Sequence, residues 1–240
     1  DKNFARKESL MHYLNRGKYH CPASSKELAE LVSASISQYF WQENLGYLAD
    51  CLHANPGAAA SEAVADDALR PNQLLAITLG AIKEPQTCQQ ILAACQQLLV
   101  PGAIRSLADR PVRHGIEIHH DGKLINDPHH PYQGRYAGDE DTRRKPAYHN
   151  GTAWTWLFPS FCEAWAITYG KESIETALSW LTSSTRLIES GCLGHITEIL
   201  DGVHPRTERG CDAQAWGVSE WVRVWKKLVE PVSPVRPQAC

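Results

Sequence analysis

The chain has 240 residues, 43% of them hydrophobic, which is enough to bury a sizeable core in one or two domains. Its formal net charge of -3 argues against nucleic acid or an anionic membrane as a partner. There is no recognisable signal peptide and no apolar run of the ~18 residues that a membrane span needs, so we expect no membrane association.

Cysteine usage indicates the compartment. The eight cysteines form neither CxxC pairs nor a dense disulfide framework, and several lie inside apolar helical patterns as small hydrophobic residues do. A reducing cytoplasm is therefore the expected location. The sequence begins with Asp1 and not with Met, so we also expect it to be a piece of a longer protein.

Helical periodicity dominates the first hundred residues. Ser25 is the expected N-cap of a first helix, whose apolar residues recur at a spacing of three to four: Leu28, Leu31, Val32, Ile36 and Phe40. Pro71 is expected to open a short helix that runs through Leu79 and ends at Gly80, because proline fits a first turn and glycine a C-terminus. A third helix is expected over 84–100.

A His-rich insert follows at 113–130, with two adjacent pairs, His119-His120 and His129-His130. Histidines and aspartates together raise the possibility of a metal site. Adjacent side chains point in divergent directions, however, and no pair has the i, i+4 spacing of a helix, so we predict no metal here. The better interpretation is a hairpin with Asp121-Gly122 as its turn, lying over the mouth of a pocket.

The segment 132–156, YQGRYAGDEDTRRKPAYHNGTAWTW, combines acids, bases and aromatics without a helical or strand period. A second segment of this character is GHITEILDGVHPRTERGCDAQAW, at 194–216. Flat apolar rings beside fixed hydrogen-bonding groups suit a sugar, because a pyranose has an apolar C–H face and a rim of hydroxyls. Both segments therefore favour carbohydrate binding.

The remaining pattern is helical again. Helices are expected at 152–169 and 172–189, joined at Gly170, and at 213–230, followed by a Pro-rich tail at 231–240. About six helices, connected alternately by short turns and long loops with almost no alternating strand pattern, predict an all-α fold.

The two aromatic segments resemble the C-terminal, amylo-alpha-1,6-glucosidase domain of glycogen debranching enzymes, which belong to the glucoamylase-like clan. The resemblance includes Phe40-Trp41, the RPNQ tetrapeptide at 70–73 and LLVPGAIRSLA at 98–108. It implies an (α/α)6 toroid of six helical hairpins, of which residues 1–230 would form the C-terminal half. An upstream half or a partner chain would then cover the exposed flank of the inner helices.

Glycoside hydrolysis requires two carboxyl groups, which inverting enzymes hold roughly 6.5–9.5 Å apart. The resemblance implies that Glu198 is the general base, because it occupies the glutamate position of the family's HISEI-type motif in GHITEILDG. The general acid would lie upstream of Asp1. The expected function is an inverting alpha-glucosidase on alpha-1,6 branch points of glycogen-like glucans, without a cofactor. Two alternatives stay open: a noncatalytic glucan-binding or assembly fragment, and a hydrolase of another alpha-glucoside.

The resemblance also implies a set of substrate-binding residues: Arg135, Tyr136, Asp139, His149, Asn150, Trp154 and Gln214. Asp139 could instead be a plain loop charge, and Trp154 a core aromatic at the start of a helix. Gln214 is expected to support the loop of the base. Asn150 stands where the family has glutamine, and this shorter amide indicates a subgroup with a shifted hydroxyl contact.

Overall fold

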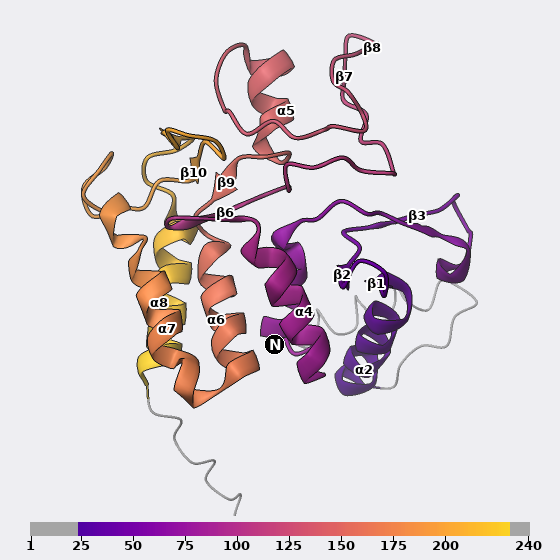
Figure 1. The fold of residues 1–240 in the computed structure, drawn as a ribbon, viewed down its shortest axis with the longest axis horizontal. Coiled ribbons are helices and arrows are strands. Elements are labelled where there is room, and N and C mark those ends of the chain that lie inside the picture. The colour runs from indigo at the N-terminus through magenta and orange to yellow at the C-terminus, as the bar shows by residue number, and fades with distance from the viewer. Residues whose placement is uncertain (1–23, 231–240) are drawn as a thin grey trace, which may run out of the picture.

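The computed structural model describes residues 24–230, so the Pro-rich tail expected at 231–240 lies outside the described residues. The helices gather at one end of the molecule, and short strands, loops and α5 lie at the other (Figure 1). Within the described range the α-helices are α2 (Ser25–Ser35), α3 (Leu74–Thr78), α4 (Pro85–Gln96), α5 (Lys145–Tyr148), α6 (Phe158–Tyr169), α7 (Ile174–Thr182) and α8 (Ala215–Val229).

Shorter turns and strands complete the chain. The π-helical turns are η1 (Ile36–Phe40) and η4 (Glu140–Arg144), and the 3-10 turns are η2 (Ala60–Glu62), η3 (Pro71–Gln73), η5 (Lys171–Ser173) and η6 (Thr185–Leu187). The strands are β1 (Trp41–Gln42), β2 (Tyr47–Leu48), β3 (Leu52–His53), β4 (Val64–Ala65), β5 (Leu99–Val100), β6 (Ala103–Arg105), β7 (His119–His120), β8 (Lys123–Leu124), β9 (Ala153–Trp154), β10 (Ile199–Leu200) and β11 (Glu208–Arg209).

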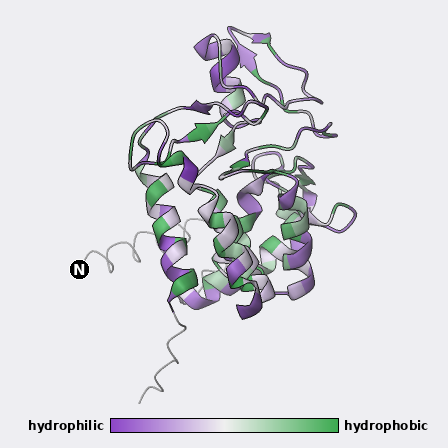
Figure 2. Cartoon of the chain, turned by 60° about the vertical axis from the view of Figure 1, so that its left-hand side comes forward, coloured by the Kyte–Doolittle hydropathy of each residue, from purple (hydrophilic) through white to green (hydrophobic). Residues whose placement is uncertain are grey.

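Helix α6 is the centre of the core. Its first seven residues, FPSFCEA, are all buried, and it packs against α3, α4, α7 and α8. A helix that is buried all round needs apolar residues on every face, whereas an outer helix needs them on one stripe only. Along the outer helices hydrophobic and hydrophilic residues alternate, while η4, which leads into α5, is coloured as hydrophilic (Figure 2).

Several helix boundaries expected from the sequence are confirmed. Pro71 begins a helical segment that ends at Gly80, where φ is 75°, and Gly170, with the same φ, ends α6. The first helix is capped by Ser24 and not Ser25, because the Ser24 hydroxyl accepts the N–H of Glu27 at 3.1 Å. None of the helices in residues 24–230 combines the length and the apolar character that crossing a bilayer requires.

The all-α prediction needs a correction, because the described residues also form three two-stranded sheets and a five-stranded antiparallel sheet in the order β11-β10-β9-β6-β5. The helix expected over 152–169 begins only at Phe158, and Ala153–Trp154 is strand β9 in the middle of the sheet. The helix expected over 84–100 likewise ends at Gln96, before β5. Strands of two or three residues are too short for alternation to appear in the sequence.

The His-rich insert forms the expected hairpin. His119 and His120 pair with Leu124 and Lys123, and the turn residues Asp121 and Gly122 have φ of 48° and 74°. Two successive positive φ angles are what a tight two-residue hairpin turn requires, which explains the Asp-Gly pair. Its position over a pocket mouth stays a prediction.

One buried carboxylate fastens α6 to α8. Glu163 is 2% exposed, and its two oxygens accept from Arg223 Nη2 at 2.7 Å and Lys227 Nζ at 2.5 Å. Burial alone would raise the pKa of Glu163, but the hydrogen bonds and charges of Arg223 and Lys227 outweigh it and keep the pKa below its usual value. The carboxylate is therefore ionised, and its position is fixed by two cations from one helix.

Replacing Glu163 by glutamine should lower the free energy of unfolding at pH 7 by roughly 1.5–3 kcal/mol, because charge-assisted hydrogen bonds are lost. A depressed folded pKa gives stability that is present above the unfolded pKa and lost as pH falls through the folded pKa. The difference from wild type should thus shrink below about pH 4. Urea unfolding across pH tests this, with Glu175→Gln on the exposed side of α7 as control; a pH-independent difference would contradict it.

Candidate active site

The backbone of Glu198 is fixed from both sides just before β10. Its N–H donates to the Cys211 carbonyl at 2.9 Å, beyond the end of β11. Its carbonyl accepts the Thr155 N–H at 3.3 Å and the Thr155 hydroxyl at 3.0 Å, beyond the end of β9. Since Thr155 is 2% exposed, these bonds lie in the interior and hold the glutamate in one register.

The Glu198 side chain is also enclosed by donors and is 6% exposed. Oε1 accepts a short hydrogen bond from the Tyr148 hydroxyl and a second from Gln214 Nε2 at 3.1 Å. Oε2 accepts the Cys211 N–H at 3.0 Å. Three donors and no acceptor suit an ionised carboxylate, and Oε2, with one partner among the described residues, keeps capacity to accept from a water molecule.

A glycine makes room for this carboxylate. A Cβ at Gly210 would lie 2.4 Å from Glu198 Oε2, and the φ of Gly210 is 73°. Both the space and the left-handed backbone therefore require glycine, which explains the RGC sequence at 209–211.

Tyr148 joins the carboxylate to a cluster of aromatic rings. Burial, followed by the hydrogen bond and charge of Glu198, raises the pKa of Tyr148 well above its usual value, so the hydroxyl stays a donor. Its ring packs edge-on against Trp154 at 4.7 Å and tilted against Tyr136 at 5.6 Å between centroids. Tyr136 thus belongs to the surroundings of the candidate base.

The cluster continues into a wall of stacked rings. His149 lies parallel to Trp154 with centroids 5.3 Å apart and an interplanar angle of 6°, and Trp156 stacks on Trp216 at 5.2 Å. Trp154 is 5% exposed, and its indole N–H donates to the Tyr148 carbonyl at 3.0 Å. Burial and the nearby Arg70 lower the pKa of His149, so its imidazole is neutral at pH 7 and can donate and accept.

This wall lines a pocket of about 410 Å³. Its lining residues combine three tryptophans and a histidine with polar groups: Asp50, Arg70, Pro71, Asn72, Ser106, His149, Trp154, Trp156, Leu157 and Trp216. The size and the mixture of flat rings with a few polar groups are typical of small-ligand sites. Glu198 is not a lining residue; Tyr148, which contacts both Glu198 and Trp154, connects it to the wall.

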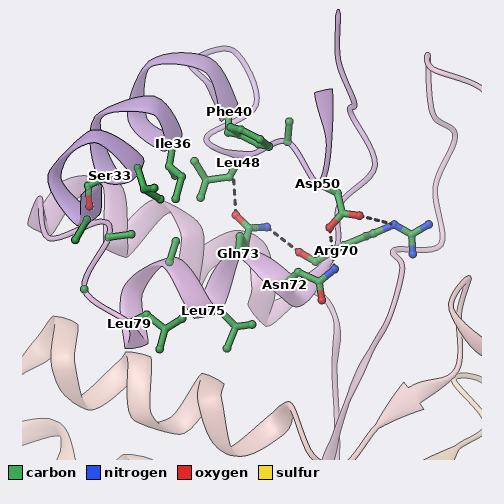
Figure 3. A pocket seen from close by; sticks show the side chains of 16 residues that line it. Ser33, Ile36, Phe40, Leu48, Asp50, Arg70, Asn72, Gln73, Leu75 and Leu79 are labelled. Carbon is green, nitrogen blue, oxygen red and sulfur yellow. Dashed lines mark hydrogen bonds and ion pairs between the residues drawn. The ribbon is translucent and has the colours of Figure 1, made fainter. Parts of the chain in front are cut away.

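A second pocket, of about 490 Å³, adjoins the first and shares Asp50, Arg70 and Asn72 with it. Mostly apolar side chains line the rest of it, from α2 and α3 and also from η1, β2 and the segment after α3 (Figure 3). Gln73 connects the two sides, accepting the Leu48 N–H at 3.1 Å and donating to the Arg70 carbonyl at 2.9 Å, as the dashed lines in Figure 3 show. The polar residues that the two pockets share, Asp50, Arg70 and Asn72, thus lie between an apolar pocket and the aromatic one.

Arg70 organises the polar side of the aromatic pocket. Its guanidinium donates to the carbonyls of Ser106, at 3.1 Å, and of His149, and to Asn150 Oδ1 at 2.8 Å. Its Nε lies 3.4 Å from Asp50 Oδ2. The site residues named from the sequence did not include Asp50, Arg70 or Asn72. The RPNQ tetrapeptide, which contains Arg70 and Asn72, could have indicated those two.

His149 and Asn150 directly follow α5, which ends at Tyr148. Asn150 uses both ends of its amide internally, since it accepts from Arg70 and donates to the Pro146 carbonyl at 2.9 Å. Its side chain therefore fixes the loop, and a role in substrate binding stays a prediction.

Asp139 caps η4. Its carboxylate accepts the Thr142 N–H at 2.9 Å and hydroxyl at 2.8 Å, and these bonds lower its pKa. The charges that follow form exposed surface pairs, such as Lys145 with Asp141 at 2.5 Å. If Asp139 also contacts a sugar, it must do so while its carboxylate accepts the hydrogen bonds that cap η4.

Arg135 and Gln214 differ in their surroundings. Arg135 is exposed and forms no hydrogen bond or ion pair with the rest of the described chain, so its guanidinium is available to a ligand. Gln214 directly precedes α8 and donates to Glu198, the contact expected of a residue that supports the loop of the base. Substrate contacts by either stay predictions.

Comparison with known proteins gives one family. The model of the family described as amylo-alpha-1,6-glucosidase matches residues 7–121 and 122–223. No curated protein matches the chain.

The hydrogen bond from the Tyr148 hydroxyl to Glu198 can be tested by its contribution to stability. Tyr148→Phe should lower the free energy of unfolding by about 1–3 kcal/mol, because a buried carboxylate loses a donor while the ring packing is kept. Tyr136→Phe is the matched control, since its hydroxyl has no partner in residues 24–230, and should change stability by less than ~0.5 kcal/mol. Equal urea midpoints for the two variants would contradict the assigned hydrogen bond.

Proposed function

The chain belongs to the amylo-alpha-1,6-glucosidase family, and we propose that it forms part of an inverting alpha-glucosidase acting on alpha-1,6 branch points of glycogen-like glucans. The observation that carries the proposal is the Glu198 carboxylate, fixed by Tyr148, Gln214 and the Cys211 N–H beside an aromatic pocket. The family is one of glycoside hydrolases; the activity of this chain, the linkage, the stereochemistry and the residue roles are our proposal.

In this mechanism Glu198 Oε2 accepts a proton from a water molecule as the water oxygen bonds to the anomeric carbon. The glycosidic C–O bond breaks at the same time, and the leaving oxygen takes a proton from a general acid. Tyr148 and Gln214 hold Oε1, and the Cys211 N–H holds Oε2, so the carboxylate does not need to reorient during the reaction. No cofactor takes part.

The pocket is suited to a glucose unit. Trp154, Trp156 and Trp216 provide flat apolar faces for the C–H side of a pyranose, and neutral His149 can exchange hydrogen bonds with hydroxyls. Asp50 and Asn72 add an acceptor and a donor at the polar end. The exposed guanidinium of Arg135 is proposed to bind sugars further from the cleaved bond.

The general acid is proposed to come from a segment outside the described residues or from a partner chain. Glu163 is an unsuitable acid because Arg223 and Lys227 hold it ionised. Asp139 is engaged as a cap. The same segment would complete the toroid of helical hairpins, of which these helices would be half, and would cover the apolar side chains exposed on α2 and after α3, namely Leu31, Val32 and Leu79.

A cytoplasmic location is part of the proposal. The six cysteines among residues 24–230 are all free, and Cys88, Cys95 and Cys162 lie in the apolar core. Buried thiols of this kind are compatible with a reducing compartment, where disulfides are rare.

One observation favours a noncatalytic glucan-binding or assembly fragment as the second candidate. Glu198 is 6% exposed and does not line the pocket, so the aromatic wall could bind a glucan without presenting the carboxylate to it. The two candidates differ in turnover and not in binding, because both use the same wall.

Glu198→Gln in the complete enzyme should therefore keep glucan binding but lower kcat for glucose release from a branched limit dextrin by at least ~10²-fold. An amide cannot accept the proton of water, although it keeps the shape of the side chain. NMR of the first glucose released should show the beta anomer if configuration at the anomeric carbon is inverted.

The control is Glu189→Gln, which removes an exposed carboxylate outside the pocket and should leave kcat unchanged. A kcat of Glu198→Gln close to wild type would end its assignment as the base. Binding without glucose release by the full protein would support the noncatalytic alternative.

A further inference from the structure

Three side chains of metal-ligating type converge at the β3–β4 hairpin, away from Glu198. Cys51 Sγ lies 3.4 Å from His53 Nε2 and 3.6 Å from Asp66 Oδ2, and His53 Nε2 lies 3.3 Å from the same Asp66 oxygen. Across residues 24–230 no other three His, Cys, Asp or Glu side chains bring their ligand atoms so close together. The proposed function makes no use of them.

The local fold accounts for the convergence. Cys51 and His53 are two positions apart in an extended segment, so their side chains lie on the same face. Asp66 follows β4 directly, and its N–H donates to the Cys51 carbonyl at 3.0 Å, which sets it opposite Cys51 on the paired strand. The hairpin register therefore brings all three ligand atoms to one face without a strained backbone.

The triangle has the size of one face of a zinc tetrahedron. With typical Zn–S, Zn–N and Zn–O distances of about 2.3, 2.05 and 2.1 Å and tetrahedral angles, ligand atoms are separated by about 3.6 Å for S–N and S–O and about 3.4 Å for N–O. The three separations found here, 3.4, 3.6 and 3.3 Å, each agree to within about 0.2 Å. A cation above the plane of the three atoms would reach all of them.

We propose that Cys51, His53 and Asp66 bind a divalent cation of the zinc class, with solvent in the fourth position. A soft thiolate, a borderline imidazole and a hard carboxylate form a mixed ligand set, which suits the borderline zinc ion better than magnesium or calcium. A thiolate and a carboxylate together also neutralise the two positive charges of the ion. Binding forms a metal–sulfur bond and releases the thiol proton to solvent.

Outer contacts hold two of the ligands in place. Asp66 is 4% exposed, and its other oxygen, Oδ1, accepts the Ala68 N–H at 2.6 Å, which leaves Oδ2 for the ion. The His53 ring stacks on His114 with centroids 3.6 Å apart and an angle of 18°. The His53 side chain is 38% exposed, so an ion can enter from solvent on that side.

The position of the site indicates a structural role. Cys51 directly follows Asp50, whose carboxylate pairs with Arg70 and accepts from Asn72 at 2.8 Å at the polar end of both pockets. An ion joining the start of β3 to the end of β4 would fix the segment that carries Asp50. The ion would thus support the pocket wall without contacting a sugar, and its presence does not depend on the proposed glucosidase activity.

The test uses Co²⁺ and Zn²⁺ with the purified chain after removal of metals by a chelator. One Co²⁺ per chain should bind with visible bands of tetrahedral cobalt and a near-ultraviolet thiolate-to-metal charge-transfer band. Zn²⁺ should displace it. At about a hundredfold excess over its Kd, Zn²⁺ should raise Tm by roughly 5–10 °C.

Cys51→Ala should abolish the charge-transfer band, and His53→Gln should weaken Zn²⁺ binding by at least ~10²-fold. Cys192→Ala removes an exposed free cysteine elsewhere and is the matched control; it should keep both signals. A double change of His119 and His120 to glutamine excludes the His-rich hairpin as the source. Unfolding curves in chelator establish that each variant is folded.

The proposal is overturned if no charge-transfer band forms, or if the band survives Cys51→Ala. It is also overturned if Zn²⁺ affinity falls with the hairpin histidines and not with His53. In those cases the three side chains are a hydrogen-bonded cluster of thiol, imidazole and carboxylate only.

Discussion

The site depends on the hydrogen bonds by which β9 and Thr155 fix the position of the segment that contains Glu198. Strand β9 pairs with β6 on one side and β10 on the other, with Trp154 opposite both Ile104 and Ile199. Just beyond β9, the Thr155 hydroxyl donates to the Thr197 carbonyl at 2.6 Å and to that of Glu198 at 3.0 Å. Buried hydrogen bonds of this kind are costly to break, so segments far apart in the chain are held in one register. Glu198 meets Tyr148 and Gln214 only because of this arrangement.

Arg70 performs a related function on the other side of the pocket. It binds the carbonyls of Ser106 and His149, the Asn150 amide and the Asp50 carboxylate, four groups from three separate parts of the chain. A planar guanidinium has five N–H donors and can serve these four acceptor groups at once, whereas a lysine ammonium has only three donors. The aromatic wall is thus supported from its polar edge, and the β3–β4 hairpin extends that support beyond Asp50.

Local sequence signals predicted much of the helical framework, but they did not reveal which strands pair across long sequence separations. Pro71, Gly80 and Gly170 marked helix ends correctly because their backbone preferences act within one turn. Strands such as β9 and β10 have two residues each, and their partners are distant in sequence, so no period revealed them. The motif around Glu198 was enough to select it as a candidate from the sequence. The contact of Arg70 with Asn150, by contrast, joins residues 80 positions apart and could be found only in the folded structure.

If Glu198 serves the aromatic pocket as a base, a crystal structure of the complete enzyme with a cationic iminosugar should show it. We expect the sugar ring against Trp154, Trp156 or Trp216, with one water molecule bridging Glu198 Oε2 and the position of the anomeric carbon. A sugar bound elsewhere, or a pocket-bound sugar still separated from Glu198 by the Tyr148 ring, would contradict it.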